Sequence, residues 1–228
     1  MKSIKISQYL LMISAVLIVL IYLKYPSINW SDKFEAVGCL ISFIIIISLI
    51  ILINKFKNIL SEGSKKNLGT GLFLGLLWTI EISMNNIIQP RVQLRDYLDN
   101  IFWGIIALFI LLISYKYTYK SKRVVTGLKT GFFIGIGSGI VACITALLLI
   151  CFGMNLLLAD PVNIAEWLEI KAKSSYPDMA SFFAYQTFAG AIMHLLILGI
   201  IMGGLLGLIA GVIGKLVNLK KKYHYENT

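Results

Sequence analysis

Long apolar runs separated by short polar links make up most of the chain. Six of these runs are long enough to cross a bilayer as helices, which takes about 20 residues each. We predict spans at about 6–23, 36–53, 68–88, 98–115, 127–157 and 183–217. The pattern therefore predicts an all-α, polytopic membrane protein with six transmembrane helices in a single membrane domain, residues 1–228.

The composition favours the same class of protein. The chain is 58% hydrophobic and 14% charged, and its mean hydropathy is +0.82. A soluble domain carries about 25% charged residues, so a disordered chain, a secreted disulfide scaffold and an ordinary soluble enzyme are excluded. The three cysteines, Cys39, Cys143 and Cys151, lie inside apolar runs without a C-x-x-C pair. We expect them to pack, and we expect no metal and no cofactor.

Lysine and arginine predict the orientation of the chain. Fifteen of the 21 Lys and Arg residues fall on one side of the predicted membrane, which the positive-inside rule assigns to the cytoplasm together with both termini. Because the net charge of +10 arises from these links, it does not require a nucleic-acid partner. We expect a multi-pass protein of the plasma membrane, the inner membrane in a bacterium, with the lipid bilayer as its surroundings.

The only sizeable external link covers 158–182. Asp160-Pro161 has the form of a helix N-cap followed by a first-turn proline, and an apolar stripe follows within 164–168. We predict a short amphipathic helix on the outer membrane surface. Pro177-Asp178 predicts the start of a second helix that leads into the last span.

A short repeat relates the third and fifth spans. Leu68–Gly75 and Leu128–Gly135 share the pattern L-x-T-G-φ-F-φ-G at an offset of 60 residues. Spans 3–4 and 5–6 are therefore candidates for parallel hairpin repeats. The alternative is chance similarity between two glycine-rich helices.

Glycine recurs at every fourth position in the fifth and sixth spans. The two series are Gly127, Gly131, Gly135, Gly139 and Gly199, Gly203, Gly207, Gly211. Residues four apart share one helix face, so each series forms a smooth stripe, and the two stripes match in depth on antiparallel helices. With Gly71 and Gly75 in the third span, they predict a tightly packed core of spans 3, 5 and 6.

Glu81 is the most informative polar residue, because it lies near the middle of the third span. A carboxylate there costs several kcal/mol unless it is paired, protonated or in contact with water. Asn85 and Asn86 follow one turn further out, and His194 lies at a similar depth in the last span. We predict that these four residues line one outward-facing cavity. The alternative is a protonated carboxyl and a neutral histidine that only hydrogen-bond within the helices.

An enzyme is not expected. Gly137-Ser138-Gly139 together with His194 is similar to the Ser–His dyad of rhomboid proteases, but Ile136 replaces the first glycine of their G-x-S-G motif. From helix rise we also expect Ser138 and His194 to lie about 15 Å apart along the membrane normal, which is beyond hydrogen-bond reach.

The architecture resembles two transporter families. Six helices with both ends inside, and short external helices before the last span, resemble the membrane subunits of ABC type-2 exporters. That resemblance implies that a cytoplasmic ATPase docks on the link 54–67. The size and helix number also resemble the S-components of energy-coupling-factor transporters, which bind vitamins from outside. As a whole the chain resembles bacterial six-helix membrane proteins, a likeness that implies no particular activity.

These observations favour a protein that binds or translocates a small solute or ion, with Glu81 as its charged centre. The alternative is a non-transporting membrane subunit or anchor. Its basic cytoplasmic links would contact a partner such as an ATPase, or it would form a homo-oligomer. Substitution of Glu81 by Gln separates the two, because only a transporter would lose its function.

Overall fold

The computed structural model describes residues 2–26, 33–56 and 60–226, without the side chains of 33–42, 56 and 221–226. Over these residues the chain is helical and contains no strand. The elements in order are α1 (Lys2–Lys24), α2 (Lys33–Phe56), α3 (Glu62–Ser83), π-helical η2 (Met84–Ile88), α4 (Val92–Ser121), α5 (Val124–Phe152), α6 (Met154–Ala159), α7 (Pro161–Ile170), α8 (Met179–Met193), π-helical η3 (His194–Met202) and α9 (Gly203–Glu226).

Among the residues that the structure describes, five helices are long and apolar enough to cross a membrane. They are α1, α3 with η2, α4, α5, and the continuous segment Met179–Lys220 formed by α8, η3 and α9. α2 is a helix of 24 residues, but its apolar part among the described side chains is only Phe43–Lys55. The structure therefore supports a multi-pass membrane protein with five candidate spans. The predicted span 36–53 lies partly outside the described side chains.

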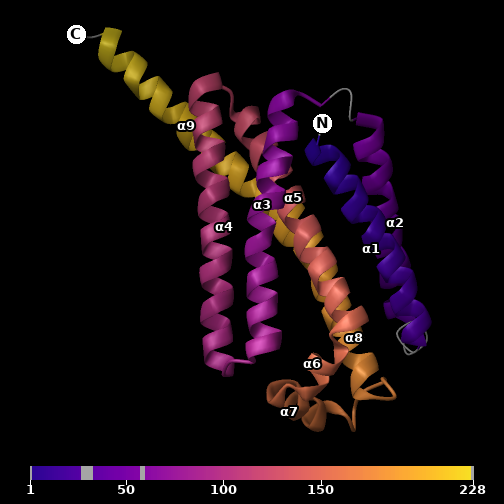
Figure 1. The fold of residues 1–228 in the computed structure, drawn as a ribbon. Helices are drawn as coiled ribbons and strands as arrows, with labels where there is room; N and C mark the ends of the chain where they lie inside the picture. Colours follow the sequence, from indigo (N-terminus) through magenta and orange to yellow (C-terminus); the bar gives the residue numbers. More distant parts are fainter. Residues whose placement is uncertain (1, 27–32, 57–59, 227–228) are drawn as a thin grey trace.

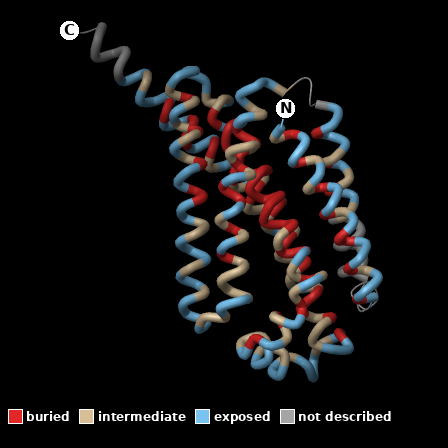
Figure 2. The backbone as a smooth tube through the Cα atoms, viewed as in Figure 1, coloured by how far each residue is buried: buried red, intermediate tan, exposed pale blue. Residues whose placement is uncertain are grey.

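α5 is the central helix of the bundle. It packs against α3 on one side and against η3 and α9 on another, while α4 contacts both α5 and α9. Buried residues concentrate along α5, and the helices around it are mostly exposed on their outer faces (Figure 2). α1 begins and α9 ends at one end of the bundle, which we call the terminal end. α6 and α7 lie at the opposite end, the loop end (Figure 1).

The predicted fifth span, 127–157, is too long. α5 stops at Phe152, where the Gly153 N–H bonds to Leu149 O at 2.7 Å, and the separate helix α6 follows. Hydropathy does not detect this break, because the residues on both sides of it are apolar. α4 is longer than the predicted 98–115, since its polar ends continue the helix beyond the apolar run.

Both predicted helix starts in the external link are confirmed. Asp160 caps α7 by accepting a hydrogen bond from the Val162 N–H at 3.0 Å. Asp178 caps α8 in the same way, from the Ser181 N–H at 2.7 Å. In each case the side-chain oxygen satisfies a backbone donor that the first helical turn leaves free.

Glycine brings the backbones of α5 and α9 together. A Cβ atom added at Gly131 would lie 2.6 Å from Gly207 Cα, and one at Gly127 would lie 2.8 Å from Gly211 Cα. Gly135 approaches Gly199 and Gly203 in the same manner. Any side chain at these positions would overlap the facing backbone, so only glycine permits this separation.

α3 lies beside α5 and runs parallel to it. The Asn67 amide donates to the Thr130 hydroxyl at 3.2 Å, and nearer the loop end the Thr79 and Thr145 hydroxyls are 2.9 Å apart. A Cβ atom on Gly75 would lie 3.0 Å from Ser138 O. These contacts fix the depth of α3, and therefore of Glu81, against the central helix.

Candidate functional site

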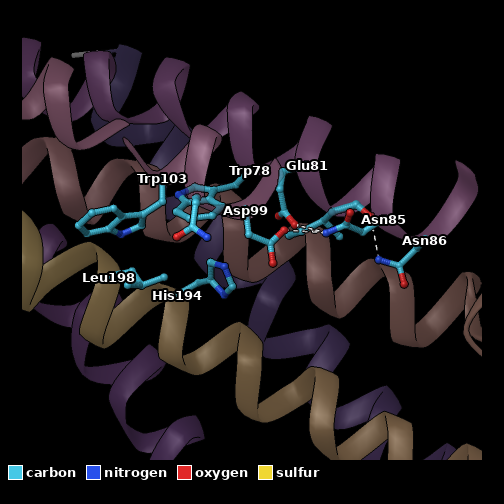
Figure 3. A pocket seen from close by; sticks show the side chains of 10 residues that line it. Trp78, Glu81, Asn85, Asn86, Asp99, Trp103, His194 and Leu198 are labelled. Atoms are coloured by element: carbon cyan, nitrogen blue, oxygen red, sulfur yellow. Dashed lines mark hydrogen bonds between the residues drawn. The ribbon is translucent and has the colours of Figure 1, made fainter. Parts of the chain in front are cut away.

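A pocket lined by several polar side chains opens between α3 with η2, α4 and η3 (Figure 3). Its volume is about 470 Å³, within the range of about 300–1,000 Å³ that small-molecule sites occupy. We call it the acidic pocket. Its lining residues are Trp78, Glu81, Ile82, Asn85, Asn86, Asp99, Asn100, Trp103, His194 and Leu198.

Two carboxylates from different helices meet at one amide in this pocket. Asn85 Nδ2 donates to Glu81 Oε1 at 2.5 Å and to Asp99 Oδ1 at 2.8 Å. Glu81 is 6% exposed, whereas Asp99 is exposed. All ten lining residues belong to the described part of the chain, and none of them is Lys or Arg. The pocket therefore contains two acidic groups and no lysine or arginine to neutralise them.

The lining residues contain further acceptor atoms. Asn85 Oδ1 is buried and has no hydrogen-bond partner among the described residues. His194 Nδ1 bonds to Gly190 O at 2.8 Å. Because a carbonyl only accepts, the Nδ1 atom carries the proton, and Nε2 is left as an acceptor. Trp78 packs edge-on against the imidazole, with ring centroids 4.7 Å apart, and fixes its orientation.

Both π-helical segments contribute to the acidic pocket. η2 contains Asn85 and Asn86, and η3 begins at His194. π-helical turns are uncommon and occur frequently at functional sites, since they rotate side chains out of the α-helical register. Asn86 is held by its own helix, because its amide donates to Ile82 O at 2.7 Å.

The loop end of the pocket is fixed by a buried ion pair, which we call the outer clamp. Arg95 binds Asp160 through two parallel bonds of 2.6 and 2.9 Å, and Asp160 is 1% exposed. The Arg95 Nε atom also donates to Pro90 O at 2.8 Å. This pair joins the first turn of α4 to the start of α7. It thereby positions Asp99, one helical turn further along α4.

The turn between η2 and α4 is held in place by the backbone and the side chain of Gln89. Gln89 adopts a left-handed conformation with φ 51° and ends the π-helix just before Pro90. Its side chain donates to Leu156 O at 3.0 Å. The α3–α4 hairpin is therefore attached to the α6–α7 segment at two points.

The structure brings together the four polar residues that the sequence singles out, Glu81, Asn85, Asn86 and His194. Asp99 was not among them, because it is the second residue of the predicted span 98–115, at the polar edge of the membrane, where charged side chains are common. α4 in fact begins at Val92, which puts Asp99 two turns inside the helix. Asp99 and Trp103 are four residues apart and share a face, and that spacing was the available signal.

The expected 15 Å separation between Ser138 and His194 is wrong. A Cβ atom added at Gly139 would lie 3.0 Å from His194 O, so the two segments lie at nearly the same level. The Ser138 hydroxyl has no partner within the residues described, while His194 Nδ1 bonds to Gly190 O. No hydrogen bond joins the serine and the histidine.

Comparison of the chain with protein-family models, with curated proteins and with solved structures finds no match. The function of the chain is therefore inferred from the geometry of the acidic pocket. In the described ranges, no cluster of three or more His, Cys, Asp or Glu side chains is arranged to bind a metal ion.

Proposed function

We propose that the acidic pocket binds a small cation, inorganic or ammonium-type, and that the protein is transporter-like. The observation that carries this proposal is the convergence of Glu81 and Asp99 on the Asn85 amide. Two carboxylates without a lysine or arginine partner are costly within a span. A bound cation compensates both charges at once, which an anion or a neutral apolar solute does not.

The rest of the pocket suits the same class of ligand. His194 Nε2 offers an acceptor beside the two carboxylates. Trp78 and Trp103 add aromatic faces, which attract cations by about 0.5–2 kcal/mol each. A cation that loses part of its hydration shell in the pocket therefore finds replacement ligands on three helices.

Tryptophan fluorescence tests this proposal directly. With Trp30 and Trp167 changed to Phe, the two remaining tryptophans, Trp78 and Trp103, both line the pocket. We expect a saturable fluorescence change when the purified protein is titrated with sodium, potassium or ethylammonium chloride. Glu81→Gln and Asp99→Asn should each weaken the response about tenfold or more, since each removes a charge that the ligand contacts.

Glu166→Gln is the matched control for this titration. Glu166 lies on α7 and accepts a hydrogen bond from Gln186 at 2.9 Å, outside the pocket lining. Its substitution should leave the titration unchanged. Wild-type protein that shows no response to any of the three cations would contradict the proposal, as would variants at Glu81 and Asp99 that titrate like the wild type.

We infer a six-span topology with both termini in the cytoplasm, in the plasma membrane of a bacterium. Supporting it, the basic links that the positive-inside rule assigns to the cytoplasm meet at the terminal end, where α1 begins and α9 ends (Figure 1). In a background without native cysteines, Gln93→Cys and Ser174→Cys should react with an impermeant thiol reagent in intact cells. Labelling of Ser121→Cys in the same cells would contradict this orientation.

A second candidate function is that of a membrane anchor. Such a protein would bind a cytoplasmic partner such as an ATPase, or it would form a homo-oligomer. The observation that favours it is α9, which extends past the neighbouring helices at the terminal end (Figure 1). Over its last described side chains this helix exposes Leu216 and Leu219 together with Lys215 and Lys220. Removing residues 219–228 would abolish partner binding by an anchor, but it would leave the cation titration of a transporter intact.

A further inference from the structure

The side chains of the acidic pocket form two layers, one polar and one apolar. The polar layer has one residue from each of α3, α4 and η3, namely Glu81, Asp99 and His194. The apolar layer also has one residue from each segment, namely Trp78, Trp103 and Leu198. Figure 3 shows Trp103 and Leu198 on one side of the two carboxylates and Asn86 on the other.

Each segment places its polar and its apolar residue about one helical turn apart. The separation is three residues on α3 and four residues on both α4 and η3, so the two residues share a face of their helix. α3 runs away from the terminal end, whereas α4 and η3 run toward it (Figure 1). The apolar residue is therefore nearer the terminal end in all three cases, about 5 Å from the polar layer.

The apolar layer is continuous with the hydrophobic core. Trp78 belongs to a cluster of buried apolar side chains from α3, α4 and α5, and Trp103 and Leu198 pack against that cluster. Trp103 and Leu198 are only partly buried, and both line the pocket. A hydrocarbon group in contact with this layer is removed from water, which favours binding.

The polar layer consists of hydrogen-bond acceptors. The Asn85 amide gives one bond to Glu81 and one to Asp99, and a carboxylate has about four lone-pair sites, so both carboxylates can accept further bonds. His194 Nε2 is the third acceptor, because Nδ1 carries the proton. Three acceptors match the three N–H donors of a primary ammonium group.

An ammonium group suits these acceptors better than a metal ion does. Divalent metal ions hold their ligands at about 2.0–2.6 Å, and within the described ranges no three His, Cys, Asp or Glu side chains are placed to do so. A charge-assisted N–H···O bond is longer, about 2.7–2.9 Å, so an ammonium nitrogen reaches acceptors that are spread more widely. A hydrated ion would also make no use of the apolar layer.

We propose that the ligand of the acidic pocket is a primary ammonium compound with a short alkyl or aryl body. This inference rests on the proposed function and narrows its ligand class. The ammonium group donates to the acceptors of the polar layer, and the hydrocarbon body packs against the apolar layer. The pocket volume of about 470 Å³ has room for such a body beside the charged group.

The test is the tryptophan fluorescence titration with a matched set of chloride salts. Butylammonium and tetramethylammonium are isomers of equal charge, but only butylammonium has N–H donors. Butylammonium should bind about tenfold or more tightly than tetramethylammonium, because the latter leaves the acceptors without partners. It should also bind about tenfold more tightly than ethylammonium, since each buried methylene raises the affinity roughly three- to fourfold.

Two variants test the two layers separately. His194→Phe keeps a ring but removes an acceptor, so it should lower the preference for butylammonium over tetramethylammonium about threefold or more. Leu198→Ala shortens the apolar layer, so it should lower the preference for butylammonium over ethylammonium by about the same factor. Each preference is a ratio of two affinities of the same folded protein, and a lower yield of folded variant does not change it.

Leu205→Ala is the matched control for Leu198→Ala. Leu205 is 47% exposed on α9 and lies outside the pocket lining. Its substitution should leave both preferences within about twofold of the wild type, as expected for a distant site. Preferences that neither His194→Phe nor Leu198→Ala alters would overturn the two-layer site.

The same titrations separate this inference from the proposed function. Tetramethylammonium, sodium or potassium that binds as tightly as butylammonium would overturn the inference, as would equal affinities for ethylammonium and butylammonium. In each of these cases a cation still binds, and the proposed function stands. A protein that responds to none of the salts contradicts the proposed function and this inference together.

Discussion

The two ends of the bundle pack by different means. Toward the terminal end, α5 and α9 touch backbone to backbone through glycine. Toward the loop end, α3, α4 and η3 separate around an acidic pocket lined by two tryptophans. The size of the facing side chains therefore sets the separation of the helices. Small residues close one end of the bundle, while large and polar residues leave room for a ligand at the other.

The ends also differ in how their helices are connected. The terminal end depends on close van der Waals contact, which acts along the full length of the glycine stripes. The loop end depends on a few polar bonds, chiefly the outer clamp between Arg95 and Asp160. Substitutions at the terminal end should therefore lower the stability of the whole bundle, whereas substitutions at the loop end should loosen only that end.

The largest effect is expected from Gly131→Leu. Its side chain would overlap the backbone at Gly207, and overpacking of two touching helices should cost about 3 kcal/mol or more. Unfolding in a detergent titration measures this cost. Gly104→Leu is the control, because a Cβ atom there meets nothing within 4 Å among the described residues. Equal stability of the two variants would show that the α5–α9 contact contributes nothing.

A local effect is expected from Arg95→Ala. It leaves the Asp160 carboxylate buried without its partner, which should destabilise the loop end by about 3 kcal/mol. Hydrogen exchange should then rise in α7 and in the first turns of α4, but not in α5. Lys65→Ala is the control, since its partner Glu62 is 83% exposed and such pairs contribute about 1 kcal/mol at most. Unchanged exchange in α7 would show that the clamp does not fix the loop end.

The sequence predicts those features of the fold and of the pocket that depend on a single residue. Asp160 and Asp178 predict two helix starts because a single side chain caps each helix. Glu81 draws attention because a carboxylate is rare in an apolar run. Asp99 is different, because its role depends on where α4 begins and on which helix lies opposite.

The break at Gly153 and the π-helical turns are missed for a related reason. They change the register of a helix without changing its hydropathy, so an apolar pattern continues through them. Tertiary packing decides these features, and packing joins residues that are far apart in the chain. The Thr79–Thr145 contact, for example, spans 66 residues.

The most direct test of the central claim is a double-mutant cycle on the acidic pocket, read by the cation titration of Trp78 and Trp103. Glu81 and Asp99 bind the same amide, so they should act on the ligand as one site. We predict that Glu81→Gln and Asp99→Asn each weaken cation binding about tenfold. The loss of affinity in the double variant should differ clearly from the product of the two single losses, because coupled residues do not act independently. Effects that simply multiply, or binding that both variants leave unchanged, would contradict a shared cation site.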